Sequence, residues 1–593
     1  MNNAWDAILG HVAQKISEAA GTTVEPSELV TPPDPKLGDL AFGCFALAQL
    51  RHDDVGATRE SPKQSPADIA KRLARQLSKD TKDQLVESVS AAGPYLNVTL
   101  ASGETVARIM SDVEAQQTLF GSSDDGKNRQ LMLEYAQPNT HKEFHVGHLR
   151  NLVLGNALAR ILTHAGWNVV TASYHGDVGA HVAKVLWLLQ RKQMADDRWQ
   201  MGSEQSGKYL GQLYTEATKL LEEHPELKQE VSEVQQKLEA GDKGLTKLWK
   251  ETRQWSLAEF KEIFDDLGTR IDRQYFESEV AEDGQKIVDE LLKKGIAKES
   301  QGAIIVDLEN EKLGVFLIRK SDGTSLYATK DLALAQLKAK EYPNLARSLI
   351  LVDNRQSLYF KQLFHTLALM GSKITYEFVG FEVVTLKSGA MSSREGNIVT
   401  YESFRDEVMK FAREETRKRH ADWNEKKIEQ TAWAIAMGGI TYGMLKQDSD
   451  KMIVFDLDRA LAFDGDTGPY IQYAATRLSG ILKKKKVESR KSKVTFDTSS
   501  IFPFSIHPAE KHLAIQMALF PKTCHRAAQE LAPHLIAQWC FAMAHAITDF
   551  YRDVKVLDAA DDLQASRLRL VAAALSVLTR GLDLLGIPLP DEM

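Results

Sequence analysis

The sequence is poor in cysteine, lacks long apolar runs and carries no excess of positive charge. Its three cysteines, Cys44, Cys524 and Cys540, lie far apart and form no Cys-x-x-Cys pair. This spacing argues against a zinc knuckle and a disulfide scaffold, and it fits a reducing compartment. No apolar run approaches membrane-spanning length, and residues 1–14 lack the basic-then-apolar pattern of a signal peptide. We therefore expect a cytoplasmic protein with no membrane partner.

The bulk composition indicates a globular protein of several domains. The chain has 593 residues, of which 43% are hydrophobic and 26% are charged, and its formal net charge is -7. At the usual domain size, this length corresponds to roughly three to five domains. Because the net charge is negative, any nucleic acid must be held by local basic patches rather than by a global cationic field.

Residues 134–151, EYAQPNTHKEFHVGHLRN, join a predicted strand to a predicted helix. An apolar run precedes them, an amphipathic pattern follows, and Pro138 breaks the chain between the two. His145 and His148 project from one face of the helix mouth, and Gly147 leaves room for a ligand near the backbone. A helix N-terminus offers unpaired N–H groups to phosphate. Taken alone, this stretch is either a phosphate cradle or an ordinary helix start.

The order of the predicted elements divides the chain into several parts. These are a small α/β unit at 1–118, an alternating strand-and-helix unit at 119–400, a helical region at 401–482, a basic linker at 483–507 and a helical bundle at 508–593. Within the second part, the charged residues 191–275 are interpreted as a helical insertion without a catalytic role. The alternation resumes with strands over 303–308 and 315–319. Alternating strands and helices predict a parallel sheet, with ligands bound beyond the carboxyl ends of its strands.

Several side chains share a predicted face and are candidates for binding. Tyr95 and Asn97 lie two apart on one strand, so their side chains point the same way. Tyr327 and Asp331 lie four apart on one helix face. Asp177, in YHGDVGA after the second strand, either faces the ligand pocket or caps a turn.

Two separated segments resemble the signatures of class I aminoacyl-tRNA synthetases: HVGH at the helix mouth, and AMSSREGN over residues 390–397. The segments PNTHKEFHVGHLRN, SDGTSLYATKDLA and FDLDRALAFDGDTGPYIQYAATR, with the C-terminal block, resemble arginyl-tRNA synthetases over nearly the whole chain. GDLAF and GPYLNV are similar to that family's additional N-terminal domain. The resemblance implies an α/β Rossmann-type catalytic domain between an N-terminal α/β domain and a C-terminal all-α bundle.

The same resemblance implies a reaction and its partners. It implies ATP-dependent ligation of L-arginine to tRNA(Arg) through an arginyl-adenylate, by a monomer that uses ATP with Mg²⁺ and no zinc. The implied catalytic and ATP-binding residues are Lys142, His145, Gly147, His148, Met391, Ser392, Ser393 and Arg394. The implied arginine-binding residues are Glu134, Asn139, Tyr327, Asp331 and Gln356. The implied tRNA-binding residues are Tyr95 and Asn97 at the elbow, with Tyr473 and Met593 near the anticodon loop.

The second signature departs from the family pattern, because Ala390 and Ser393 stand where lysines normally meet the phosphates. Lys142 resembles the lysine that many arginyl enzymes use instead, and Arg394 keeps a cation in the loop. A guanidinium needs planar acceptors, which suits Glu134 and Asp331 and suits lysine as a substrate poorly. Two alternatives stay open: a binding or regulatory paralogue that keeps the fold and the tRNA contacts but has lost activation chemistry, and another class I ligase or nucleotidyltransferase that uses a different acid.

Overall fold

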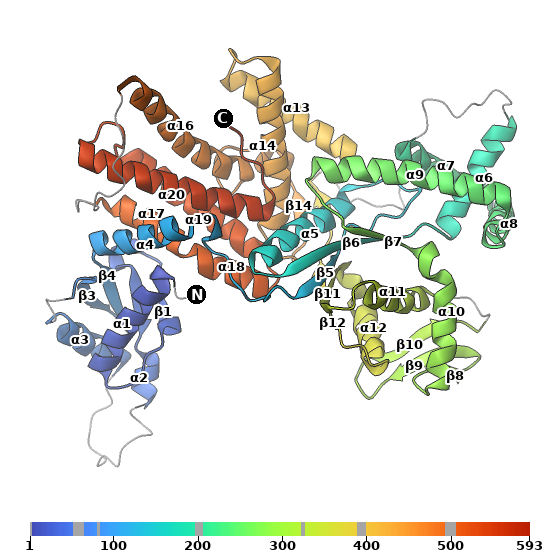
Figure 1. The fold of residues 1–593 in the computed structure, drawn as a ribbon, viewed down its shortest axis with the longest axis horizontal. Coiled ribbons are helices and arrows are strands. Elements are labelled where there is room, and N and C mark those ends of the chain that lie inside the picture. The colour runs from blue at the N-terminus through green and yellow to red at the C-terminus, as the bar shows by residue number, and fades with distance from the viewer. Residues whose placement is uncertain are drawn as a thin grey trace.

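The computed structural model describes residues 3–50, 65–79, 83–195, 206–321, 326–387, 399–492 and 506–593. Figure 1 shows an elongated molecule with a strand-rich centre, the N-terminal unit at one end and a group of helices, α6 to α9, at the other. None of the helices within the described ranges combines the length and apolarity needed to cross a bilayer.

The central sheet has five parallel strands in the order β12-β11-β5-β6-β7. These strands are β5 (Gln130–Glu134), β6 (Asn168–His175), β7 (Arg273–Phe276), β11 (Leu345–Asp353) and β12 (Thr375–Phe381). The helices packed around them are α5 (Val146–His164), α10 (Glu277–Lys293), α11 (Tyr327–Glu341) and α12 (Ser357–Leu369). The prediction of an α/β fold around a parallel sheet is confirmed.

The middle strand β5 separates two apolar cores. Leu131 and Leu133 are fully buried in the core that contains α5. Met132, between them, is fully buried in the core that contains residues of α10 and α11. Because successive side chains of a strand point to opposite faces, a strand covered on both faces reads as a continuous apolar run. This burial fixes β5, and with it the position of Glu134 at its carboxyl end.

The strands over 303–308 and 315–319 exist, but they do not continue the parallel sheet. The elements β9 (Ala303–Leu308) and β10 (Gly314–Arg319) pair antiparallel, and β8 (Lys298–Ser300) completes a separate three-stranded sheet. The connection over 309–313 is too short for the helical crossover that a parallel pair needs, so the two strands form a hairpin. The interpretation of these strands as resumed parallel alternation was wrong.

The insertion is helical, as predicted, but it ends earlier than residue 275. Its helices are α7 (Gly207–Glu223), α8 (Lys228–Glu239) and α9 (Lys243–Asp266), which pack with α6 (Ala180–Ala195) around a core of their own. Arg273–Phe276 is β7, an edge strand of the central sheet. The expected boundary near residue 275 therefore falls within β7, because the charged pattern runs on into a half-buried strand.

The N-terminal unit is an antiparallel sheet with helices on it. Its strands, in the order β1-β2-β4-β3, are β1 (Leu29–Val30), β2 (Leu40–Gly43), β3 (Val86–Ala92) and β4 (Tyr95–Leu100). Its helices are α1 (Ala4–Ala20), α2 (Phe45–Leu50), α3 (Pro66–Leu77) and α4 (Ser102–Gln116). Gly38 has φ 126°, and a Cβ there would lie 2.8 Å from the Val98 carbonyl oxygen, so this turn against β4 requires glycine. Lys511, from the C-terminal helices, pairs with Asp39 at 2.8 Å and joins this unit to them.

The C-terminal half is helical. It contains α13 (Tyr401–Arg419), α14 (Glu425–Leu445), α15 (Leu457–Ala460), α16 (Gly468–Ser492), α17 (Pro508–Ala518), α18 (Phe520–Gln529), α19 (His534–Asp553) and α20 (Asp561–Leu585). A parallel pair, β13 (Val384–Leu386) and β14 (Ile453–Phe455), links it to the catalytic half. Short 3₁₀ turns lie at Pro26–Glu28, Pro35–Leu37, Gln117–Leu119, Pro225–Leu227 and, as η5, Asn354–Gln356.

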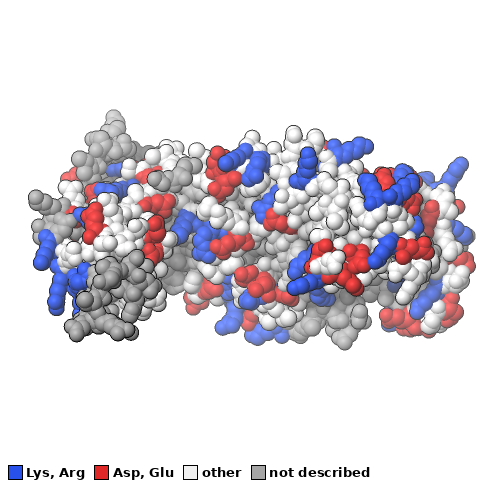
Figure 2. All heavy atoms as spheres, turned by 90° about the horizontal axis from the view of Figure 1, so that it is seen from below, with Lys and Arg blue, Asp and Glu red and all other residues white. Residues whose placement is uncertain are grey.

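The predicted basic linker begins too early. Residues from 483 onward continue α16 to Ser492, and residues 493–505 lie outside the described part of the chain. Lys483 donates a hydrogen bond to the carbonyl oxygen of Asp591 at 2.7 Å, and Lys485 contacts Gln564 of α20. The lysine run is thus partly used to hold the C-terminal segment, and its charge was not evidence of a linker. Figure 2 shows Lys and Arg interspersed with Asp and Glu on one face, in keeping with the moderate net charge.

Candidate active site

A cavity of about 390 Å³ lies at the carboxyl ends of β5 and β6, where parallel sheets bind ligands. Its predicted residues come from three separated parts of the chain, which are the end of β5 with the following loop, the first turns of α11, and η5. The five residues predicted to bind arginine all line it: Glu134, Asn139, Tyr327, Asp331 and Gln356. The structure therefore brings this whole predicted set together.

The cavity wall is strongly acidic, and two of its three carboxylates have lysine partners. Glu134 forms a buried ion pair with Lys338, whose side chain is 3% exposed. Glu277 accepts a hydrogen bond from Lys330 at 2.6 Å. Asp331 instead accepts from the hydroxyl of Tyr359 and has no lysine partner within the described residues. The site thus holds one carboxylate whose charge a bound cation can complement.

The environment of Asp331 raises the pKa of its carboxyl group to about 7. Burial is the main cause, the neighbouring Glu134 and Glu277 carboxylates add to it, and the Tyr359 hydrogen bond opposes it. Tyr174 lies close to the same carboxylates, and burial, followed by Asp331, raises its pKa far above the usual range. The Tyr174 hydroxyl is buried and has no hydrogen-bond partner among the described residues.

Sequence reasoning missed several polar residues of this cavity, among them Tyr174, Glu277, Lys338 and Tyr359. A signal existed for Lys338, because it follows Asp331 by seven residues and so lies on the same helix face. Glu277 begins α10 directly after β7, a strand end that was assigned to the insertion. Tyr359 gave no signal, since it reaches Asp331 only through the packing of α12 against α11.

The two histidines of HVGH form a compact pair at the start of α5. Their rings stack with centroids 3.8 Å apart. The N–H of Gly147 donates to Nδ1 of His145 at 3.1 Å, and the N–H of His145 donates to Nδ1 of His148 at 3.2 Å. Burial, assisted by Lys142, lowers the pKa of His145 to about 4, and burial lowers that of His148 well below its usual value. Both rings are therefore neutral at pH 7, with their proton on Nε2 available for donation.

Gly147 is required for a reason different from the one expected. A Cβ at this position would lie 2.9 Å from the His145 ring. The glycine therefore makes room for the histidine that caps the helix, and that ring then stays folded over the helix mouth. The expected space for a ligand against the Gly147 backbone is filled on this side by the imidazole.

Residues 399–401, which follow the second signature, are hydrogen-bonded to residues 144–146 at HVGH. The N–H of Val146 donates to the Val399 carbonyl at 3.2 Å, and the N–H of Tyr401 donates to the Phe144 carbonyl at 3.0 Å. His145 and Thr400 form an antiparallel bridge. Residues 388–398, and with them Met391, Ser392, Ser393 and Arg394, lie outside the described residues. The loop therefore ends beside the histidine pair.

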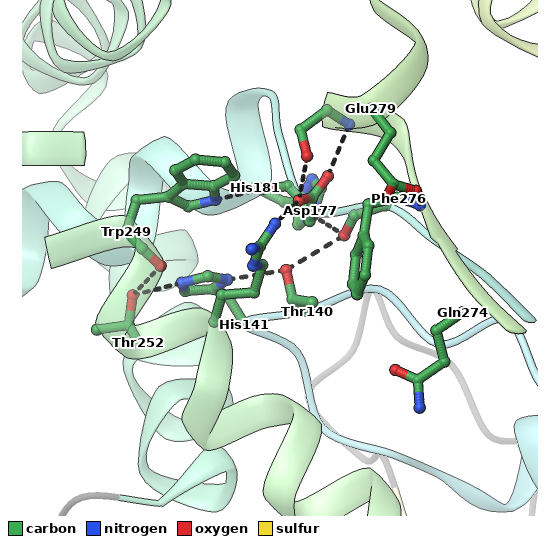
Figure 3. Close-up of polar contacts among 12 residues, drawn as sticks. Thr140, His141, Asp177, His181, Trp249, Thr252, Gln274, Phe276 and Glu279 are labelled. Carbon is green, nitrogen blue, oxygen red and sulfur yellow. Dashed lines mark hydrogen bonds and ion pairs between the residues drawn. The ribbon is translucent and has the colours of Figure 1, made fainter. Parts of the chain in front are cut away.

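The loop that carries Lys142 is held by the helical insertion (Figure 3). His141 is fully buried; its Nε2 lies 2.8 Å from Thr252 Oγ1 of α9, and its N–H donates to Ser256 Oγ at 2.9 Å. Burial lowers the pKa of His141 to about 3, so the ring is neutral. Lys142 itself lies with Nζ 4.9 Å from the centroid of the Tyr214 ring on α7.

Asp177 takes the capping role, the second of the two that the sequence left open. Its carboxylate accepts from the N–H of Ser278 at 2.9 Å and from Ser278 Oγ at 2.7 Å, in the first turn of α10. It also accepts from Nη1 of Arg253 at 2.7 Å. Trp249 donates to the Asp177 carbonyl oxygen at 2.7 Å, as Figure 3 shows. Asp177 is fully buried by these contacts and joins α9, β6 and α10.

The residues predicted to contact tRNA differ in their exposure. Tyr95 is 41% exposed and packs edge-on against Phe45. Asn97 is only 2% exposed, and its side-chain nitrogen has no hydrogen-bond partner among the described residues. Tyr473 stacks under Arg477 at 4.2 Å, and Met593 packs against the main core.

Two further features lie apart from this site. A larger cavity of about 1080 Å³ lies near the amino-terminal half of β6, between α5, α14 and α20. It contains none of the predicted site residues. Within the described part of the chain, no group of three or more His, Cys, Asp or Glu side chains could hold a metal ion.

Three family models match the chain. They are described as "Arginyl tRNA synthetase N terminal domain" over residues 6–100, "tRNA synthetases class I (R), catalytic domain" over 109–457 and "DALR anticodon binding domain" over 471–593. An arginine–tRNA ligase of Bdellovibrio bacteriovorus is 35% identical over 95% of this chain and 94% of its own. One of Streptococcus thermophilus is 33% identical over the full length of both.

Solved structures are similar in fold over the same extent. The arginyl-tRNA synthetase of Thermus thermophilus superposes with a TM-score of 0.76 and 26% identity, covering 98% of this chain and 100% of its own. The arginyl-tRNA synthetase of Plasmodium falciparum superposes with a TM-score of 0.72, covering 99% of this chain and 98% of its own. At 19% identity this likeness shows the fold alone.

Proposed function

The chain belongs to the arginyl-tRNA synthetases, and from this premise we propose how its residues carry out the reaction. It is an arginine–tRNA ligase that uses ATP as a substrate in translation. In the first step a carboxylate oxygen of arginine attacks the α-phosphorus of ATP, and the bond to pyrophosphate breaks. In the second, a ribose hydroxyl of the terminal tRNA nucleotide attacks the carbonyl carbon, and AMP leaves. Little covalent work falls to the protein, so positioning and charge neutralisation dominate.

The cavity at the ends of β5 and β6 holds arginine in this proposal. The observation that carries it is the convergence of Glu134, Glu277 and Asp331 in one cavity, in which Asp331 has no lysine partner among the described residues. A guanidinium has five planar donors and no acceptor, so carboxylates are its natural partners. Asp331 takes the guanidinium, the neighbouring carboxylate of Glu277 adds negative charge although it is paired with Lys330, and the exposed ring of Tyr327 stacks on the guanidinium from the rim.

The other end of arginine faces the HVGH helix. Asn139 binds the α-amino group and Gln356 lines the same wall, which leaves the carboxylate directed toward the nucleotide. Glu134 is already paired with Lys338, so its part is to hold the shape and charge of the pocket. Support for this arrangement comes from the position of Asn139 directly against Gly176, where a Cβ would lie 2.3 Å from its Oδ1.

ATP binds at the mouth of α5. The neutral rings of His145 and His148 donate through Nε2 to nucleotide oxygens, and Lys142 supplies a cation to the phosphates. Met391, Ser392, Ser393 and Arg394 are assigned to ATP as well, and the support for this is that residues 399–401, which follow them in the chain, are hydrogen-bonded to HVGH. Mg²⁺ would enter with ATP and would offset part of the phosphate charge, a mode that asks few ligands of the protein.

The terminal domains bind tRNA(Arg). We assign residues 1–118 to the elbow, with the exposed ring of Tyr95 as a platform for a base. For Asn97 to contact tRNA, the residues that cover it must move.

We assign residues 508–593 to the anticodon loop, together with α16, which carries Tyr473. Met593 lies at the edge of this proposed surface. The matched anticodon-binding model over 471–593 supports including α16. We further propose that the protein is a monomer and acts in the cytoplasm.

The test is the charging of bulk tRNA with each amino acid in turn, with and without ATP. Arginine alone should be attached, and only with ATP. No charging at all would indicate a paralogue without activation chemistry, and attachment of another amino acid would reassign the pocket. Because activation in this family generally needs bound tRNA, pyrophosphate exchange is assayed with tRNA present.

A further inference from the structure

Two lysines face one aromatic ring beside the HVGH helix. Nζ of Lys142 lies 4.9 Å from the centroid of the Tyr214 ring, and Nζ of Lys184, on α6, lies 5.5 Å from the same centroid. Neither ammonium group has a carboxylate partner among the described residues, whereas Lys192, two turns further along α6, pairs with Glu216 at 2.9 Å. Two unpaired cations held against one ring repel each other, and an anion between them would remove that repulsion.

The positive field of this corner reaches the nucleotide site. Lys142 helps to lower the pKa of His145 and of His181, each to about 4, after the larger effect of burial. His181 precedes Lys184 by three residues on α6, so the two share a helix face. Lys184 therefore lies on the same side of α6 as His181, whose pKa Lys142 helps to lower, and it faces the same Tyr214 ring as Lys142.

Close packing of the helical insertion places Tyr214 beside Lys142 and Lys184. A Cβ on Gly211 of α7 would lie 2.1 Å from Cγ of Glu143 and 3.0 Å from its main-chain nitrogen. The absence of a side chain at residue 211 lets α7 approach the loop directly, and Tyr214 follows one helical turn later. The insertion thus touches the residue next to Lys142 and presents its ring to it.

We propose that Lys184 is a second cation for the pyrophosphate part of ATP, and that Tyr214 positions Lys142 and Lys184 around it. This rests on the proposed role of Lys142. When the bond from the α-phosphorus breaks, negative charge accumulates on the departing pyrophosphate, and the two ammonium groups neutralise it. Lys184 then supplies part of what the lysines missing at residues 390 and 393 would supply. The helical insertion takes part in catalysis through these contacts.

The first experiment compares Lys184→Ala, Lys184→Arg and the control Lys192→Ala in arginine-dependent pyrophosphate exchange with tRNA present. A charge-assisted hydrogen bond to phosphate is worth a factor of about ten to a hundred, so Lys184→Ala should raise the KM for pyrophosphate at least about tenfold. The KM for arginine should stay unchanged, Lys184→Arg should recover most of the loss, and the control should match the unaltered enzyme. An unchanged KM for pyrophosphate and for ATP in Lys184→Ala would overturn the inference.

The second experiment uses inorganic pyrophosphate alone as a probe, with binding measured by titration calorimetry. Lys184→Ala should weaken its binding, whether or not Lys142 has the role proposed for it. Tyr214→Phe keeps the ring and should bind and exchange normally, while Tyr214→Leu should lose both without a lower melting temperature. Normal binding in Tyr214→Leu would remove the positioning role. Normal exchange in Lys142→Ala would overturn the assignment of Lys142 and leave the result for Lys184 to be judged by binding.

Discussion

Arg253 of α9 donates a hydrogen bond from Nη1 to Oδ2 of Asp177 at 2.7 Å, and this contact ties the helical insertion to the end of β6. The carboxylate is fully buried and also accepts from the N–H and hydroxyl of Ser278. Asp177 therefore connects three elements: it pairs with a guanidinium of α9, caps α10 and follows β6, which ends at the cavity that contains Asp331. A charged residue so close to the cavity is here a structural support.

Asp177→Ala should destabilise the protein strongly. Removing one partner of a buried ion pair costs about 3–5 kcal/mol, because the remaining charge loses its compensation. The free energy of unfolding from urea denaturation measures this, with Asp549→Ala, at the exposed pair with Arg552, as a control expected to change little. A variant that keeps full stability but no longer binds arginine would instead make Asp177 a substrate ligand.

Asp331→Asn should impair arginine binding far more than ATP binding. The amide keeps the size of the side chain but removes the charge that complements a guanidinium. A charged hydrogen bond is worth about 1.5–3 kcal/mol, so the KM for arginine should rise about tenfold to a hundredfold. Steady-state exchange with tRNA present measures both KM values, with the surface variant Asp307→Asn as a control. Equal effects on arginine and ATP would contradict the assignment.

The activity should depend on pH through Asp331. Its pKa is raised to about 7, and the ionised form is the one that binds a guanidinium, so kcat/KM for arginine should rise as the pH increases through 7. Asp331→Asn should lose this dependence. Tyr359→Phe removes the hydrogen bond that lowers the pKa, and should move the rise to higher pH.

The stability of the arginine-free protein should show the opposite trend. Because the folded-state pKa lies above the ordinary value of about 3.9, the native state binds more protons than the unfolded state between that value and about 7. The contribution of Asp331 to stability is therefore lost as the pH rises through this window and is constant above it. Urea midpoints measured across the window, compared with Asp331→Asn, test the sign. A steeper rise in stability for the unaltered protein would contradict it.

The parallel sheet, and the gathering in one cavity of the five residues expected to bind arginine, could be predicted because they depend on local pattern and on family resemblance. Glu134 and Asn139 sit beside a strand end, and Tyr327 and Asp331 share a helix face; such relations are local. Their partners were harder to predict. Tyr359 meets Asp331 only through the packing of one helix on another, and no spacing in the sequence encodes that contact.

Errors in the fold prediction arose where a local pattern supports two tertiary arrangements. The sequence pattern of β9 and β10 is compatible with a parallel or an antiparallel sheet. The short connection over 309–313 decides between the two arrangements. The run of lysines after residue 482 is typical of a linker, but Lys483 donates a hydrogen bond to the C-terminal segment. Tyr95 and Asn97 are two apart on one strand, but Tyr95 is 41% exposed and Asn97 only 2%, a difference that their spacing does not encode.

The ion pair of Lys338 with Glu134 should show strong coupling in a double-mutant cycle. Both side chains are almost fully buried, so Lys338→Met leaves an uncompensated carboxylate and should cost about 3–5 kcal/mol of unfolding free energy. Adding Glu134→Gln removes that charge and should restore much of the loss. If the two changes had additive effects on the free energy of unfolding, measured by urea denaturation, Lys338 and Glu134 would not interact as the structure shows.

Lys142→Ala should abolish formation of the adenylate with little loss of stability. The side chain is partly exposed and its Nζ contacts the Tyr214 ring, so its removal leaves no buried charge without a partner. Arginine-dependent pyrophosphate exchange with tRNA present measures activation, and the melting temperature measures folding. Lys142→Arg keeps a cation and should retain part of the activity, while the surface variant Lys261→Ala should behave as the unaltered enzyme. Near-normal exchange in Lys142→Ala would show that the phosphates find their cation elsewhere, with Arg394 and Lys184 as the next residues to change.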